Sequence, residues 1–181
     1  MYIMRAWNIA NSILIKSFKD KIYITPLKLN CLIYLLYGEY LYLTGEVLFN
    51  DLIMKSDKGP LTFSIYEKFG SYRNNVIKSY ARDAKDKVIY AKSEKFDECL
   101  NYVWEKYKNK SENEILSYID GEYRYHNKQK GERIEPRDIL IDIIRIKVKD
   151  LERAKGYSKT LKLSNNRRNN LGIDELWKLI N

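Results

Sequence analysis

The sequence predicts a mainly α-helical fold with a small β-hairpin or sheet. We expect one compact helical domain around a central buried helix, followed by a basic C-terminal extension. Three observations support this prediction. Apolar residues recur at helical spacing in most segments, residues 25–45 form an almost continuous apolar and aromatic run, and one short β-branched stretch precedes a cluster of turn residues. A chain of 181 residues can bury a core without help from a metal or a disulfide.

Two helices are predicted in the N-terminal part of the chain. The first spans residues 5–19, where apolar residues recur at helical spacing. The second spans residues 25–43. Thr25 suits its N-cap, and Pro26 suits the first helical position, because that position needs no intrahelical N–H. Gly45 suits a left-handed C-cap, so we expect the helix to end there.

The second helix is apolar on almost every side, which raises the question of a membrane span. It carries Lys28, Asn30, Gly38 and Glu39. A charge facing lipid costs about 2–3 kcal/mol even on insertion scales, so burial inside a domain explains the segment better. We therefore expect no membrane contact and a core that includes Leu29, Leu32, Ile33, Leu36 and Tyr40.

The next segment, residues 46–61, is predicted as a strand or hairpin edge that ends in a turn. It is short and rich in β-branched residues, and Asp57, Gly59 and Pro60 interrupt it. Unpaired strand edges tend to pair with other chains. We therefore expect an edge near residues 47–55 to be a natural contact for a partner or for a second copy of the chain.

A third helix is predicted from about Leu61 to Gly70, and the segment that follows it is ambiguous. We expect residues 72–92 to form a helix or loop and then a short strand at residues 87–91. The third helix has four residues predicted to face inward: Phe63, Ile65, Tyr66 and Phe69.

The remaining elements are mostly helical. Residues 93–108 have a clear amphipathic pattern. Ser111 and Glu114 form a capping box that begins a short helix. We expect residues 120–136 to form a loop and a last helix to begin at Pro136.

The sequence contains no established catalytic motif. A cluster of His126 with Asp120 and Glu122 lies in the predicted loop, and one histidine with two flexible carboxylates is weak support for a metal or an acid–base pair. Cys31 and Cys99 lie far apart and outside any CxxC pair. We therefore predict no catalytic residue, no cofactor and no metal. The cysteine usage and the absence of a secretory signal favour the cytoplasm.

The net charge of +9 is concentrated near the C-terminus. Residues 146–181 contain nine basic and four acidic residues, which gives +5 for this segment. Such a tail binds nucleic acid, binds an acidic partner or is a solvated lysine-rich face. If it binds nucleic acid, the expected contacts are Lys159, Lys162, Arg167 and Arg168.

Residues 24–69 resemble the Panacea domain, a family of phage-associated proteins that includes the SocA-type antitoxins. The resemblance depends on Thr-Pro-Leu-Lys-Leu at positions 25–29, then Gly45, then Gly59-Pro60, then a helix with Tyr66 and Phe69. The later segment "DECLNYVWEKYKNKSENEILSYID" also looks like the helix, short gap and capped helix of that family.

This resemblance implies a Panacea-like helical domain in residues 1–145. Residues 146–181 lie outside the resemblance, and we expect them to form a basic, helical or partly flexible extension. It implies a non-enzymatic antitoxin that neutralises a toxin or another protein by direct contact. It also allows a proteolytic adaptor that delivers its partner to a protease. A nucleic-acid-binding or regulatory protein remains the alternative that the basic tail suggests. The proposed partner-binding residues are Lys58, Pro60, Tyr66 and Tyr72.

Overall fold

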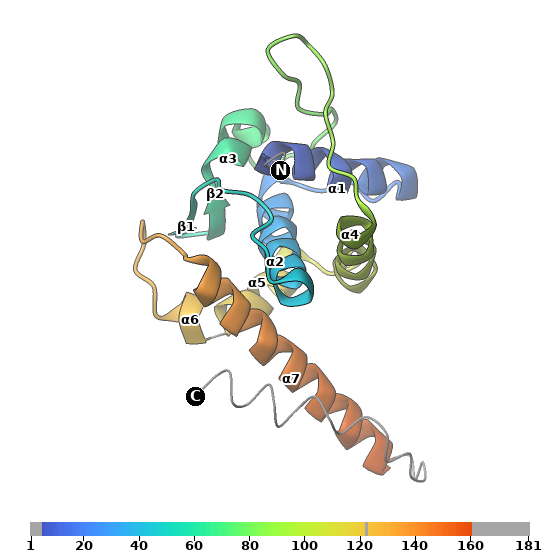
Figure 1. The fold of residues 1–181 in the computed structure, drawn as a ribbon, viewed down its shortest axis with the longest axis vertical. Coiled ribbons are helices and arrows are strands. Elements are labelled where there is room, and N and C mark those ends of the chain that lie inside the picture. The colour runs from blue at the N-terminus through green and yellow to red at the C-terminus, as the bar shows by residue number, and fades with distance from the viewer. Residues whose placement is uncertain (1–4, 122, 161–181) are drawn as a thin grey trace.

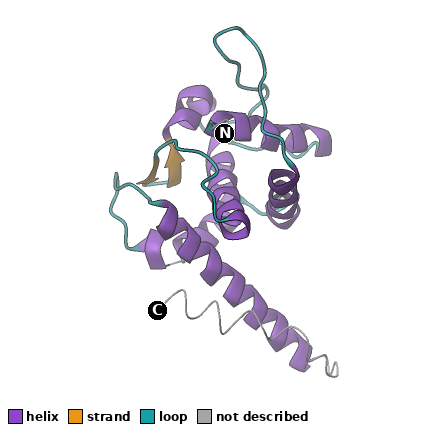
Figure 2. Cartoon of the chain, viewed as in Figure 1, coloured by secondary structure: helices purple, strands orange, loops and turns teal. Residues whose placement is uncertain are grey.

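The computed structural model describes residues 5–121 and 123–160, which form helices and one two-stranded antiparallel sheet (Figures 1 and 2). The helices are α1 (Ala6–Asp20), α2 (Pro26–Thr44), α3 (Phe63–Phe69), α4 (Glu94–Tyr107), α5 (Glu112–Asp120), α6 (Tyr123–His126) and α7 (Pro136–Thr160). The strands are β1 (Ile53–Ser56) and β2 (Gly59–Thr62), and a 3-10 helix, η1 (Gly70–Tyr72), follows α3. The mainly α fold with a small hairpin is therefore confirmed.

Helix α2 lies at the centre of the molecule (Figure 1). It packs against α1, α3, α4, α5 and α7, so it is buried on several sides. Its predicted ends are confirmed: the Thr25 side chain accepts a hydrogen bond from the backbone N–H of Lys28, and Gly45 has a left-handed φ of 72°. Of the predicted core residues, Tyr40 is half-buried and four are buried: Leu29, Leu32, Ile33 and Leu36.

Gly38 marks the place where α7 crosses α2. A Cβ atom at this position would lie only 2.1 Å from Cγ1 of Ile143 on α7. The missing side chain therefore allows the two helices to pack closely. None of the helices in residues 5–121 and 123–160 combines the length and the apolar character that crossing a bilayer requires.

A buried carboxylate connects α2, α6 and α7. Asp142 of α7 accepts a hydrogen bond from the Tyr34 hydroxyl at 3.0 Å. It also accepts from the backbone N–H groups of Arg124 at 3.0 Å and Tyr125 at 2.9 Å. These bonds hold a helical turn, α6, inside the segment 120–136 that the sequence predicted as a loop. Bonds to a buried charge are among the stronger ones in a protein.

Polar side chains of α1 hold the long segment after η1. The side-chain amide of Asn11 donates to the carbonyl oxygens of Ala81 at 2.9 Å and Ile89 at 2.7 Å. Because these backbone groups are bound to α1, the strand predicted at residues 87–91 does not form. The β pairing described in this segment is a single isolated bridge between Arg82 and Val88. The segment projects beyond α1 as a loop (green in Figure 1).

Helix α3 differs from its prediction in orientation. Ile65 and Phe69 are buried as expected, but Phe63 is 51% exposed and Tyr66 is 59% exposed. Residues three or four apart share one face of a helix. Ile65 and Phe69 therefore form the inner face against α1 and α2, whereas Phe63 and Tyr66 form an outer face that is more than half exposed.

The other predicted helices are confirmed, namely α1, α4, the capped α5 and the helix that begins at Pro136. The boundary expected at residue 145 falls inside α7, where Ile146 and Val148 are buried. Of the four basic tail residues, only Lys159 lies within the described residues, and only its helical backbone is described. The other three lie outside the described residues: Lys162, Arg167 and Arg168.

Candidate functional site

The turn between β1 and β2 is tightly constrained. Asp57 and Lys58 form a two-residue connection, and Ser56 pairs with Gly59 across it. The Ser56 hydroxyl donates to the Gly59 carbonyl at 2.7 Å and accepts from the Lys58 backbone N–H at 3.2 Å. Gly59 has a φ of 128°, a conformation that favours glycine.

Gly59 also brings the turn against α5. A Cβ atom on Gly59 would lie 2.5 Å from Cδ2 of Leu116, so a larger residue there would displace the end of the Leu116 side chain. The Gly59-Pro60 pair recognised in the sequence therefore has two structural roles. It provides the backbone conformation, and it allows the close approach.

The outer edge of β1 is not free for pairing with another chain. The Lys55 N–H donates to the Glu132 carbonyl at 3.0 Å, and the Gly131 N–H donates to the Lys55 carbonyl at 2.8 Å. Residues 131–134 cover this edge, so the expectation of an unpaired edge near residues 47–55 is wrong for β1. The covering segment is remote in sequence, and no local pattern indicates the contact.

Two hollows flank the hairpin turn, and Ser56, Asp57 and Lys58 line both of them. The first, which we call the α5 hollow, has a volume of about 340 Å³, and its other lining residues are Lys55, Gly59, Asn113, Leu116, Ser117, Asp120 and Tyr125. The second, which we call the α3 groove, has a volume of about 560 Å³, and its other lining residues are Leu27, Asn30, Pro60, Leu61, Tyr66, Gly70, Arg73 and Asn74.

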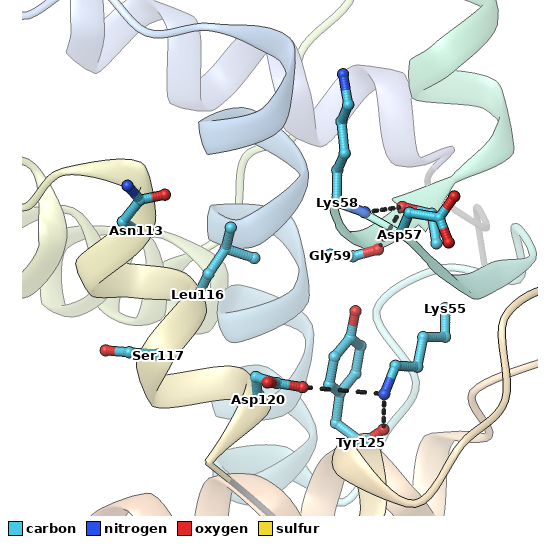
Figure 3. Close-up of a pocket in the computed structure, with 10 residues that line it drawn as sticks. Lys55, Asp57, Lys58, Gly59, Asn113, Leu116, Ser117, Asp120 and Tyr125 are labelled. Carbon is cyan, nitrogen blue, oxygen red and sulfur yellow. Dashed lines mark hydrogen bonds and ion pairs between the residues drawn. The ribbon is translucent and has the colours of Figure 1, made fainter.

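The polar groups of the α5 hollow largely bind each other (Figure 3). Nζ of Lys55 donates to the carbonyl oxygens of Tyr125 at 3.1 Å and His126 at 3.0 Å, and it lies 3.9 Å from the Asp120 carboxylate. The Tyr125 hydroxyl is buried without a hydrogen-bond partner among the described residues. Burial raises the pKa of Tyr125 well above the ordinary tyrosine value, so its hydroxyl stays protonated.

The cluster of His126, Asp120 and Glu122 considered in the sequence analysis is not compact, and its described side chains are exposed. Nδ1 of His126 lies 3.8 Å from the Asp120 carboxylate, and both side chains are more than half exposed. Glu122 lies outside the described residues. Within the described part of the chain, no three potential metal ligands are grouped so that they could hold an ion.

The α3 groove has an apolar floor. Leu27, Pro60 and Leu61 are buried or half-buried, and the Tyr66 ring stands beside them on the outer face of α3. The ring packs on Gly70, since a Cβ atom there would lie 3.1 Å from two carbon atoms of the ring. The groove is therefore a partly apolar surface with one large aromatic side chain at its wall.

The charged side chains at the rim of the α3 groove are mainly cationic. Neither Lys58 nor Arg73 forms an ion pair with another residue in the described part of the chain. The Asp57 carboxylate is paired with Lys130, so it does not neutralise them. The groove consequently combines an apolar floor with two uncompensated positive charges.

A family model described as "Antitoxin SocA-like, Panacea domain" matches residues 29–135. The chain belongs to this family. The matched region begins inside α2, contains the hairpin and α3 to α6, and ends just before α7. No curated protein and no solved structure matches the chain.

In this Panacea-domain protein, three of the four proposed partner-binding residues come together. Lys58, Pro60 and Tyr66 all line the α3 groove, with Pro60 buried in its floor. Tyr72 does not line the groove; it is half-buried, and its hydroxyl shares a hydrogen bond of 2.8 Å with Ser79.

Sequence reasoning missed Arg73, Leu27 and Leu61 as lining residues. No motif marks Arg73, because its place at the rim depends on the turn after η1. Leu27 and Leu61 belong to segments that were correctly predicted, but their proximity depends on how β2 packs against α2.

Proposed function

We propose that this protein is a non-enzymatic antitoxin that neutralises a toxin or another protein by direct binding, in a toxin–antitoxin or phage-associated system of the bacterial cytoplasm. Membership of the SocA-like family supports an antitoxin-type function and a protein partner. The observation that carries the proposal in this chain is the outer face of α3, where Phe63 and Tyr66 remain exposed beside the α3 groove.

Large aromatic side chains suit protein recognition. A tyrosine adds much contact area at a small cost in conformational entropy, and aromatic residues are frequent among those that dominate binding energies. The helix has no need to expose these rings for its own stability, because Ile65 and Phe69 already attach it to the core. A partner that covers Phe63 and Tyr66 would remove this apolar surface from water.

The α5 hollow supports the non-enzymatic part of the proposal. Nucleophiles and general bases need side chains that can reach a substrate. Here the Lys55 ammonium is bound to backbone carbonyls, and the protonated Tyr125 hydroxyl is buried. Neither group is poised for proton transfer.

A capture experiment in the native host tests the proposal. The full-length tagged chain is recovered at low and at high salt, and both protein and nucleic acid are identified. The captured protein is then expressed with and without the chain, and cell growth is measured. We expect one protein to be retained at high salt and its toxicity to be suppressed, because an apolar interface responds weakly to salt.

Two tyrosine variants show whether the outer face of α3 is used. Tyr66→Ala should weaken suppression of toxicity, whereas Tyr90→Ala should not. The pair is well matched, since Tyr66 is 59% exposed and Tyr90 is 54% exposed, and Tyr90 lines neither hollow. Equal suppression by both variants would contradict this use of α3.

The same experiment separates the alternatives. Recovery of nucleic acid alone, lost at high salt, would contradict the antitoxin proposal and favour binding through the basic tail, since phosphate contacts depend steeply on salt. Disappearance of the partner from the cell, together with co-recovery of a protease, would favour the adaptor over direct masking.

A further inference from the structure

We propose that the α3 groove binds an acidic, amphipathic segment of the protein partner, one that places apolar side chains on the floor and carboxylates on the cationic rim. This inference rests on the proposed function and specifies the chemistry of the partner. It depends on the floor, on the two rim charges and on the backbone that positions them.

The floor suits a few side chains of a polypeptide. Its volume of about 560 Å³ lies within the range of pockets that bind compact ligands, about 300–1,000 Å³. Leu27, Pro60 and Leu61 provide apolar contact, and the exposed Tyr66 side chain lines the groove with them. An apolar or aromatic side chain inserted beside Tyr66 would bury both surfaces.

The rim adds a preference for negative charge. Lys58 and Arg73 have no acidic partner among the described residues, and Asp57 is occupied by Lys130. Figure 3 shows that the Lys58 side chain leaves the turn on the side away from Asp120 and Tyr125, so it does not fill the α5 hollow. Two uncompensated cations beside an apolar floor are complementary to a segment that carries carboxylates near its apolar anchor.

The backbone holds Arg73 at the rim. Its φ of 52° and ψ of −114° are unusual for a residue with a side chain. A hydrogen bond of 2.8 Å from the Asn75 N–H to the Tyr72 carbonyl closes the turn around it. The tight turn fixes the position from which the guanidinium projects, and Arg is well suited to bidentate recognition of a carboxylate.

Gly70 allows the Tyr66 ring to lie close to the backbone. The Tyr66 ring rests on this glycine, at a distance that leaves no room for a further methyl group without a shift of the ring. Gly70 has a normal helical φ of −62°, so an alanine there would keep the backbone and would shift the ring by a few tenths of an ångström. The position therefore offers a way to change the groove without removing a side chain from it.

The test uses peptides displayed on a surface and selected against the full-length chain. Selection from a random library should enrich sequences with Asp or Glu next to aromatic or large aliphatic residues. One enriched peptide is then synthesised with its carboxylates intact, with each Glu→Gln or Asp→Asn, and with each replaced by Lys. We expect the amide version to bind on the order of tenfold more weakly, because it loses charge complementarity.

Variants of the chain complete the test. Charge reversal by Lys58→Glu with Arg73→Glu should weaken the acidic peptide on the order of tenfold and should restore binding of the Lys-substituted peptide. Lys92→Glu is the control, since Lys92 is exposed and lines neither hollow. Tyr66→Ala and Gly70→Ala should each weaken the acidic peptide, and Tyr90→Ala should not.

Three results would overturn the inference: no enriched peptide, enrichment of neutral or basic sequences, or binding that the charge-reversed chain retains unchanged. Each is separate from failure of the proposed function. A chain that suppresses a toxin but selects no acidic peptide is an antitoxin that binds by another surface or another chemistry. A chain that selects acidic peptides through the groove but suppresses no toxin binds a different kind of protein.

Discussion

Helices α2 and α3 both carry tyrosines within apolar patterns, but the tyrosines in the middle of α2 and the tyrosine of α3 lie in opposite environments. On α2, Tyr34 is 0% exposed and Tyr37 is 3% exposed, whereas Tyr66 on α3 is 59% exposed. Five helices pack against α2, whereas two helices, α1 and α2, pack against α3, together with β2 and η1. Tyr34 and Tyr37 therefore belong to the core, whereas Tyr66 belongs to the surface, as does Tyr42 near the end of α2 at 37% exposed.

The difference shows that an apolar sequence pattern does not by itself predict which side chains are buried. It indicates how many apolar residues a helix carries, but the number of its neighbours decides how many of them are buried. An aromatic residue that no neighbouring element buries stays exposed and is available for contact with a partner. We therefore assign stability to α2 and recognition to the outer face of α3, and the following predictions test this division from the largest expected effect to the smallest.

Loss of a core side chain on α2 should have the largest effect. Leu32 is 1% exposed, and Leu32→Ala should lower the free energy of unfolding by about 2–5 kcal/mol. Leu43, near the end of the same helix, is 40% exposed, so Leu43→Ala should change it by about 0.5 kcal/mol or less. Urea unfolding followed by circular dichroism measures both. Similar losses in the two variants would contradict the central role of α2.

Removal of one hydroxyl from α2 should have a smaller effect. Tyr34→Phe deletes the hydrogen bond to the buried Asp142 carboxylate and should cost about 1.5–3 kcal/mol. Tyr37→Phe is the matched control, because the Tyr37 hydroxyl has no hydrogen bond to a described residue, and it should cost less. The same unfolding measurement decides between them. A neutral Tyr34→Phe would mean that Asp142 does not depend on this donor.

Alkaline pH should destabilise the core through its buried tyrosines. Burial raises the pKa of Tyr37 to about 12 and that of Tyr107 to about 12, against 10.0 for an exposed tyrosine. Above pH 10 the unfolded chain therefore loses protons that the folded chain keeps, so stability is fully present below pH 10 and falls as the pH rises towards 12. Each pKa unit is worth on the order of 1 kcal/mol.

Unfolding at a series of pH values measures this loss. Tyr37→Phe should reduce the alkaline decline, because the variant removes one group that titrates differently in the two states. A decline that is unchanged in Tyr37→Phe would assign the effect to other groups.

Truncation on the outer face of α3 should have the smallest effect on stability. Tyr66→Ala should change the free energy of unfolding by about 0.5 kcal/mol or less. Its neighbour Ile65 is 0% exposed, so Ile65→Ala should cost about 2–5 kcal/mol. The two adjacent positions thus compare the two faces of one helix. A large loss in Tyr66→Ala would mean that this side chain supports the fold and not only a partner.

Local chemistry made much of the fold predictable. Thr25, Gly45 and Ser111 act through bonds to residues within four positions along the chain, so the ends of α2 and the start of α5 could be predicted from the sequence. Long-range contacts could not. The cover over the β1 edge comes from residues 131–134, and the bonds that prevent a strand at residues 87–91 come from α1.

The site was predictable in part for the same reason. Lys58, Pro60 and Tyr66 lie close together in sequence around the family's Gly-Pro pair, so one motif indicates them all. Arg73 reaches the rim through an unusual turn, and Leu27 reaches the floor through the packing of β2 against α2. Neither relation leaves a local signal.

Hydrogen–deuterium exchange of the full-length chain, with and without the captured partner, tests the division between α2 and α3 most directly. We predict that the partner slows exchange in residues 56–74, which contain the turn, β2, α3 and η1, and leaves exchange unchanged in residues 31–44 of α2, which follow the groove residues Leu27 and Asn30. Protection confined to the far half of α7, with residues 56–74 unaffected, would contradict it.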